Sequence, residues 1–279
     1  MVSIILLEGD RYMFLTKKSR LKILLMVICY LVLGSLCIAL SITSELIWMD
    51  SVIFYIGIIL YALCPLLVLW GLYAEGKGIL INFGNKLVRN ELKPAEFIEY
   101  YENLKNSPDL IVNKPSIEIL NLLSTAYELL GDKEHSMQIV DEMLLIAGEK
   151  KKNLVKLIKV SHLFDCGKIE EAEMLFEEVR SLKMDFVCQS LADAILKTDR
   201  ANALGDYKTV EVYNLNRLEQ SFPKLDNAGK LVVNFSLGEV YEKMGDNEKA
   251  IKHYRFCAEN GGETAIKDAA NTAIEKLCQ

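Results

Sequence analysis

The sequence predicts an all-α protein: an N-terminal transmembrane helical hairpin followed by an α-α solenoid of stacked helix pairs. Two observations support this prediction. Near the N-terminus lie two long apolar stretches without a single charged residue. Beyond them, apolar residues recur at helical spacing between Glu and Lys residues, and glycines interrupt this pattern at regular intervals.

The two apolar stretches are long enough to cross a membrane. There are 22 uncharged residues between Lys22 and Glu45, and 24 between Asp50 and Glu75. A helix rises about 1.5 Å per residue, so each stretch covers roughly 30 Å of hydrocarbon. The predicted order is a tail at 1–20 and two spans within 21–74, at about 22–43 and 51–74, joined by an external loop at 44–50.

We considered two other interpretations of these stretches. A pair of buried core helices is disfavoured because such helices rarely continue beyond about 20 residues without a charge. A cleaved signal peptide is disfavoured because the first stretch is too long and no convincing small-residue cleavage site follows it. The start of translation is open between Met1 and Met13, since an ordinary basic membrane-protein start follows Met13.

The charges that flank the stretches predict their orientation. Basic residues precede the first stretch and follow the second, whereas the loop "SELIWMD" contains two acidic residues and no basic one. Basic residues resist translocation, so both termini are expected in the cytoplasm of a multi-pass plasma-membrane protein, which we expect to be bacterial. The flanking basic residues are Lys17, Lys18, Arg20, Lys22, Lys77, Lys86 and Arg89.

Composition excludes several functions for the rest of the chain. Residues 1–73 contain five basic and four acidic residues, so the total net charge of −6 leaves −7 for residues 74–279. This acidic balance disfavours nucleic-acid binding, which needs a positive surface. The seven cysteines include no C-x-x-C pair, which is typical of reduced thiols in a cytoplasmic domain.

Four glycines divide the region after residue 93 into similar units. They are separated by 36, 38 and 40 residues, and each lies between two amphipathic stretches of helix length. Glycine readily adopts the left-handed backbone that ends a helix, and the polar residue after it begins the next helix. A single helix pair cannot bury its apolar face alone, so successive pairs are expected to stack. The turn glycines are Gly131, Gly167, Gly205 and Gly245.

The stretch "LGEVYEKMGDNEKAIKHY" resembles a tetratricopeptide repeat. Its residues stand at the spacing of the family's signature positions: Leu237, Gly238, Tyr241, Gly245, Ala250 and Tyr254. The resemblance implies that the small Gly238 and Ala250 allow the two helices to approach closely, and that the tyrosines fill the groove between repeats. It also implies a cytoplasmic scaffold that binds proteins and has no catalytic activity or cofactor.

The earlier units are more divergent from the family. The unit at Gly167 keeps Ala172 and Phe176, whereas the unit at Gly131 has Ser136 where the family has alanine. The spacing also exceeds the family period of about 34 residues, so an irregular all-helical domain is the alternative. The predicted layout is a juxtamembrane helix or linker at 75–93, the repeat domain at 94–279 and a capping helix at 263–277.

A search for catalytic and ligand-binding motifs gives only weak signals. "GLYAEGKG" approaches a phosphate-binding loop but lacks the Ser or Thr after Lys77, so no nucleotide site is predicted. His162 and Cys166 are one helical turn apart but have no further ligands for a metal. We expect Cys166 to pack at a helix end beside an exposed histidine.

If the repeat alignment holds, polar residues on the first helix of each pair face a concave groove. In this family that groove binds an extended peptide or a partner helix, and an acid-rich groove favours a partner with basic residues. An ordinary solvated helix face is the alternative. The other function considered is a peptide-sensing regulatory or accessory subunit of a membrane complex. The candidate groove residues are Asn121, Thr125, Glu128, Ser161, Asp165, Asp199, Asn202, Glu239 and Glu242.

Overall fold

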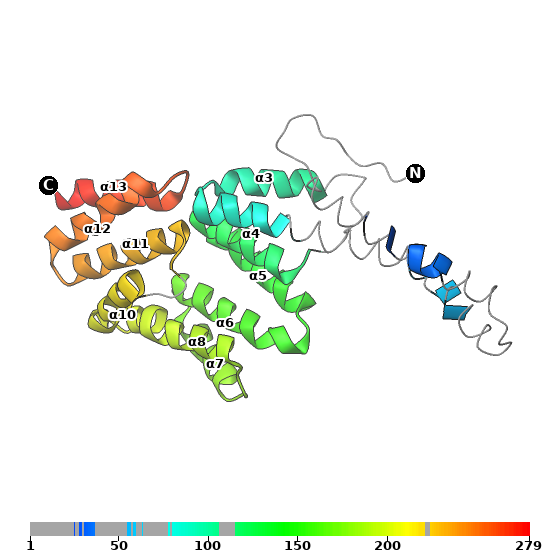
Figure 1. Ribbon diagram of the computed structural model, residues 1–279. Coiled ribbons are helices and arrows are strands. Elements are labelled where there is room, and N and C mark those ends of the chain that lie inside the picture. Colours follow the sequence, from blue (N-terminus) through cyan, green and yellow to red (C-terminus); the bar gives the residue numbers. More distant parts are fainter. Residues whose placement is uncertain are drawn as a thin grey trace, which may run out of the picture. The chain divides into compact units, whose positions relative to one another are not determined.

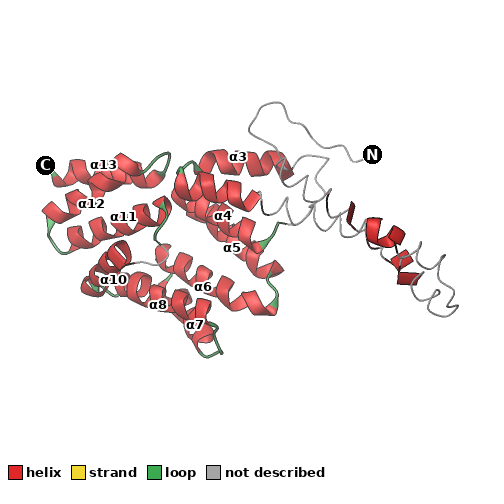
Figure 2. Ribbon diagram, viewed as in Figure 1, coloured by secondary structure: helices red, strands yellow, loops and turns green. Residues whose placement is uncertain are grey.

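The computed structural model describes residues 25, 28–29, 31–36, 55–56, 58–59, 63, 78, 80–105, 115–220 and 224–279. Within these residues the regular elements are helices and no strand occurs (Figure 2). The chain divides into two compact units, one of residues 1–82 with 108–113 and the other of residues 83–107 with 114–279.

Most of the first unit lies outside the described residues, including the predicted tail, the external loop and most of both predicted spans. The few described residues between 25 and 63 are helical. Among the described residues, no helix combines the length and the apolar character that crossing a membrane requires. The membrane hairpin therefore stays a prediction.

The second unit is built from consecutive helices (Figure 1). They are η1 (Asn85–Asn90, a π-helix), α3 (Pro94–Lys105), α4 (Ile117–Leu129), α5 (Lys133–Ile146), α6 (Glu149–Asp165), α7 (Ile169–Arg180), α8 (Phe186–Ile195), η2 (Leu196–Arg200, a π-helix), α9 (Ala201–Ala203), α10 (Tyr207–Gln220), α11 (Asn227–Lys243), α12 (Asn247–Asn260) and α13 (Ala265–Leu277).

From α4 onward these helices form four successive pairs and a final single helix, and η1 and α3 pack on α4 before them. The pairs are α4 with α5, α6 with α7, the continuous helix α8–η2–α9 with α10, and α11 with α12. Helix α13 then packs on α12. The coarse prediction of an all-α helical repeat is confirmed within the described residues.

The four predicted glycine turns are also confirmed. Gly131, Gly167, Gly205 and Gly245 have φ values of 76°, 72°, 77° and 79°, the left-handed region that favours glycine. In three of these turns an aspartate follows and caps the next helix through its side chain, as Asp246 does by accepting from the Lys249 N–H. The turn at Gly167 has lysine there and no side-chain cap.

The last pair shows why its signature residues are needed. A Cβ atom added to Gly238 would lie 2.6 Å from Cε1 of Tyr254, which is only 1% exposed. Leu237 and Ala250 of the same pair are also fully buried. The tyrosine ring therefore lies directly on the backbone of α11, and only glycine permits that approach.

The segment that contains η1 contacts helix α11 of the last pair, so the beginning and the end of this unit meet. The four pairs thereby form a closed ring. We call this contact the clasp; it joins residues 89–92 to residues 226–227 and 262–263. Asn227 Nδ2 donates to the Asn90 carbonyl at 2.7 Å, and the Glu263 N–H donates to the Leu92 carbonyl at 2.9 Å. Figure 1 shows the loop before α13 beside α3 and α4.

The backbone has a positive φ on both sides of the clasp, at Leu92 and at Gly262. Leu92 has a φ of 55°, which is unfavourable for a residue with a branched side chain, and it is 4% exposed. Gly262 opposite has a φ of 57°, and a Cβ atom there would lie 2.7 Å from Cβ of Leu92. The clasp thus depends on a glycine and holds a leucine in a strained conformation.

Candidate ligand-binding site: an acidic cluster in the helical ring

Four carboxylates from four different helices come together in the ring, and we call them the acidic cluster. They are Glu128 on α4, Asp165 on α6, Asp199 on η2 and Glu239 on α11. Each lies on the first helix of its pair, which is the face predicted to line the groove. Asp165 interacts electrostatically with Glu128, Asp199 and Glu239, so carboxylates far apart in sequence are near one another in space.

The surroundings of the cluster disfavour its negative charge. Burial and repulsion from Asp165 and Asp199 raise the pKa of Glu128 to about 8. Burial and repulsion from Asp199 and Glu239 raise the pKa of Asp165 to about 7, and burial raises the pKa of Asp199 and of Glu239 as well. The Glu128 side chain is still 38% exposed, so water and solutes reach the cluster from one side.

Helix geometry adds to this negative potential. Asp165 is the last residue of α6, and Glu128 is the last but one of α4. The C-terminal end of a helix carries partial negative charge on its free carbonyl groups, so a carboxylate there is unfavourably placed. Lys133 reaches the same place, where its Nζ donates to the Asp165 carbonyl at 2.7 Å. The site therefore suits positively charged groups.

The other predicted groove residues have different surroundings. Ser161 supports the cluster, because its Oγ donates to Asp199 Oδ2 at 2.6 Å. Thr125 donates to the carbonyl of Asn121 in its own helix, and Asn202 accepts from Lys243. Within the predicted set, the four carboxylates of the acidic cluster are therefore the residues that share one site and have raised pKa values.

Glu242 differs from the four cluster residues. Its carboxylate is 2.8 Å from Lys276 of α13 and accepts from Tyr254 at 3.0 Å. The hydrogen bond and charge of Lys276 lower the pKa of Glu242, the direction opposite to that in the cluster. Glu242 of α11 therefore contacts both α12 and α13.

A buried polar network lies behind Glu128. His162 Nδ1 is 3.0 Å from Glu128 Oε1, and its Nε2 is 3.3 Å from Ser124 Oγ. Ser136 Oγ donates to the Ser124 carbonyl at 3.0 Å. Ser136 stands where the repeat family has alanine. This difference from the family pattern was the one feature of the sequence that pointed to the network.

The connectivity of Ser124, His162 and Glu128 matches that of a serine hydrolase triad, but its setting does not. Ser124 is 2% exposed and lies inside a helix, where its hydroxyl has no space for a substrate. Its neighbouring backbone N–H groups are used in the helix, so they cannot stabilise an oxyanion. Burial lowers the pKa of His162 to about 4, so the imidazole is neutral at pH 7. The network links the first two pairs.

The expectation for His162 and Cys166 was wrong. The histidine is 6% exposed, whereas Cys166 is exposed at the end of α6. The histidine is buried because two serines and Glu128 provide polar partners for its ring. Within the residues that the structure describes, no group of three or more His, Cys, Asp or Glu side chains is arranged to hold a metal ion.

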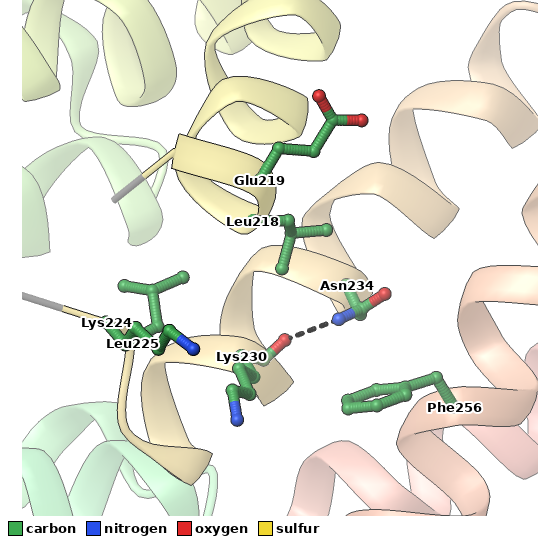
Figure 3. A pocket seen from close by; sticks show the side chains of 7 residues that line it. All are labelled: Leu218, Glu219, Lys224, Leu225, Lys230, Asn234 and Phe256. Atoms are coloured by element: carbon green, nitrogen blue, oxygen red, sulfur yellow. Dashed lines mark hydrogen bonds between the residues drawn. The ribbon is translucent and has the colours of Figure 1, made fainter. Parts of the chain in front are cut away.

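A separate pocket of about 370 Å³ lies between α10, α11 and α12 (Figure 3). Leu218 and Phe256 point into it, whereas Glu219 points away. Asn234 in its wall is already engaged with the Lys230 carbonyl and His253. The pocket combines apolar side chains with two exposed lysines, and its one buried polar side chain, Asn234, already has partners, so the acidic cluster is the better candidate for a specific site.

One segment of the chain is similar to a known repeat family. Residues 232–259 match the tetratricopeptide repeat family. The match covers most of α11 and α12, the pair in which the signature residues were recognised. Repeats of this kind commonly bind proteins or peptides and form interaction scaffolds. The comparison with curated proteins gives no match, and the comparison with solved structures gives none either.

Proposed function

We propose that the chain is a non-catalytic interaction scaffold, held at the plasma membrane by its N-terminal hairpin. Its cytoplasmic helical ring binds a segment of a partner protein that carries basic residues. The observation that supports this proposal is the acidic cluster, in which four carboxylates share one site and each has a raised pKa. Ionisable groups with strongly shifted pKa values concentrate at functional sites. Crowding or burying their charge destabilises the fold, so such groups are retained mainly where they serve binding or catalysis.

A basic partner segment fits the cluster on electrostatic grounds. The ammonium group of Lys133 lowers the pKa of Glu128, Asp165 and Glu239, which shows how a positive charge relieves the crowding. Further ammonium or guanidinium groups from a partner would do the same and form charge-assisted hydrogen bonds. Anchoring at a membrane raises the effective concentration toward other membrane proteins, so modest affinity suffices.

The binding proposal predicts the behaviour of a simple basic probe. An acetylated, amidated tetralysine peptide is expected to bind the full-length chain in detergent micelles, with an affinity that falls as salt is raised. At about pH 9, where the four carboxylates are mostly ionised, replacing Asp165→Asn together with Glu239→Gln removes two of their charges and is expected to weaken binding about tenfold. Isothermal titration calorimetry measures both. Equal affinity in wild type and double variant would contradict the assignment of the site.

Glu275→Gln provides the matched control for that experiment. Glu275 is an exposed acidic residue on α13, outside the cluster. Its replacement alters the total charge by one without altering the cluster. The control variant is expected to bind tetralysine with wild-type affinity, which separates local recognition from general attraction to an acidic protein.

The membrane part of the proposal has its own test. The two uncharged stretches before residue 75 predict that the chain stays in the membrane fraction after alkaline carbonate extraction. The exposed turn at Gly245 is expected to be cut by protease only when the cytoplasmic side is accessible. Release by carbonate, or cleavage at this turn from the external side of intact cells, would exclude the proposed anchor or its orientation.

A further inference from the structure

The buried polar network behind Glu128 is a chain of hydrogen-bonding groups from three helices. His162 Nδ1 of α6 is 3.0 Å from Glu128 Oε1 of α4. On the other side of the imidazole, Nε2 is 3.3 Å from Ser124 Oγ of α4, which in turn is 2.9 Å from Ser136 Oγ of α5. The histidine and both serines are at most 6% exposed, so their donors and acceptors pair with one another and not with water.

The direction of this chain depends on whether Glu128 carries a proton. A protonated carboxyl group donates to Nδ1 of His162, so the imidazole holds its own proton on Nε2 and donates to Ser124. The Ser124 hydroxyl then donates to Ser136, which donates to the Ser124 carbonyl at 3.0 Å. In this state every donor in the chain has an acceptor.

An ionised Glu128 reverses the chain. A carboxylate only accepts, so the imidazole proton lies on Nδ1, and the bare Nε2 accepts from the Ser124 hydroxyl. Ser124 has a single hydroxyl proton, so it no longer donates to Ser136, whose own proton stays on the Ser124 carbonyl. Ser136 Oγ is also 3.5 Å from Nδ1, a longer contact than that of Glu128. Ionisation of Glu128 thus removes one hydrogen bond between α4 and α5.

The neutral pair is favoured over an ion pair of protonated His162 with ionised Glu128. Burial lowers the pKa of His162 to about 4, whereas burial raises the pKa of Glu128 to about 8. Charged groups on the surrounding helices also act on Glu128. Repulsion from Asp165 of α6 and Asp199 of η2 favours its protonated form, and Lys133 of α5 opposes them. At pH 7 the proton that the two residues share therefore lies on Glu128.

We propose that His162 is a tautomer switch that couples the protonation of Glu128 to the buried contact between α4 and α5. When Glu128 releases its proton to water, the imidazole proton is found on Nδ1 instead of Nε2, and the Ser124 hydroxyl turns from Ser136 to Nε2. The hydrogen bond between the two serines is present below about pH 8, where Glu128 keeps its proton, and is lost as pH rises through that value. This switch needs no ligand in the groove.

Ser136 is the residue that completes the protonated state. Alanine, which the repeat family has at this position, could not accept from Ser124. Ser136→Ala removes two hydrogen bonds from the state with protonated Glu128 and one from the ionised state. It is therefore expected to lower the midpoint of the tautomer change by roughly half to one pH unit. Ser181→Ala, at an exposed serine outside the network, is the control and is expected to leave the midpoint unchanged.

Nitrogen-15 NMR of the full-length chain, labelled at histidine and held in neutral detergent micelles, measures the tautomers directly. At about pH 7 we expect His162 to have a bare Nδ1 and a protonated Nε2, and at about pH 9.5 the reverse. His253 is the internal control, because its Nδ1 faces the amide oxygen of Asn234 at 2.9 Å, and that amide donates to the Lys230 carbonyl. Asn234 does not titrate, so His253 is expected to keep its proton on Nδ1 at both pH values.

Glu128→Gln is the decisive variant, because it keeps the shape of the side chain and cannot titrate. Its His162 tautomer is expected to be the same at both pH values. A proton on Nδ1 of His162 at about pH 7 in the wild type, or a wild-type tautomer that does not change up to about pH 9.5, would overturn the switch. If Glu128→Gln does not fold, Ser136→Ala decides instead, and a midpoint equal to that of the wild type would refute the chain.

Discussion

Replacing Tyr254 with alanine is expected to lower the free energy of unfolding of the helical ring by about 3–5 kcal/mol. The ring of Tyr254 is 1% exposed, lies on the backbone of Gly238, and packs against Phe235 with 5.5 Å between ring centroids. Its hydroxyl donates to Glu242, which also holds Lys276 of α13. The substitution therefore leaves a cavity and weakens the attachment of the last helix.

Urea unfolding followed by circular dichroism measures this loss. Tyr254→Phe provides the control, since it keeps the ring and removes only the hydrogen bond, at a cost of about 1 kcal/mol. A loss in Tyr254→Ala no larger than that in Tyr254→Phe would show that the ring packing contributes little.

Neutralising two cluster carboxylates is expected to stabilise the protein at alkaline pH. In the folded ring the pKa of Glu128 is raised from 4.5 to about 8, and that of Asp165 from 3.8 to about 7. The folded state thus keeps protons that the unfolded chain releases, so stability falls as pH rises from about 4 to about 8 and levels off above that. The double variant Glu128→Gln with Asp165→Asn removes this penalty.

The expected gain near pH 8 is about 1 kcal/mol for each carboxylate, because solvent reaches them and screens their repulsion. Thermal unfolding at about pH 5 and pH 8 measures it: the wild type loses stability between the two values, and the double variant loses less. The capping aspartates, such as Asp132 and Asp246, have lowered pKa values and lose their stabilising effect only at more acidic pH. An equal loss of stability between the two pH values in the variant and in the wild type would show that repulsion and burial do not destabilise the two carboxylates.

The features predicted correctly from the sequence are those that depend on neighbouring residues. Each turn glycine is followed at once by the start of a helix, so its left-handed backbone could be inferred from the local pattern. Gly238 and Tyr254 belong to one hairpin, and the resemblance to the repeat family implied the close approach of its helices at Gly238; Tyr254 itself lies on Gly238 within the pair and not in the groove between repeats, where it was expected. Helix periodicity also placed Glu128, Asp165, Asp199 and Glu239 on the first helix of each pair, and their role in a binding groove stays a prediction.

The features that were missed depend on contacts between distant segments. The pairing of Arg89 with Asp226 joins residues 137 apart, and no local pattern specifies it. The raised pKa values arise from packing around the carboxylates, which a helix-face argument does not describe. Glu242 shows the limit most clearly: its position on the helix resembled that of Glu239, but α13 provides Lys276 as a partner.

Closure of the ring has a consequence for how this protein can vary. An open repeat array gains or loses a unit at its end with little effect on the rest, because each unit contacts only its neighbours. Here the last pair must meet the segment around Leu92, so adding or deleting one unit would displace Gly262 from its partner. The number of helix pairs is therefore fixed by geometry, and changes in chain length are tolerated only in the loops that point away from the joint.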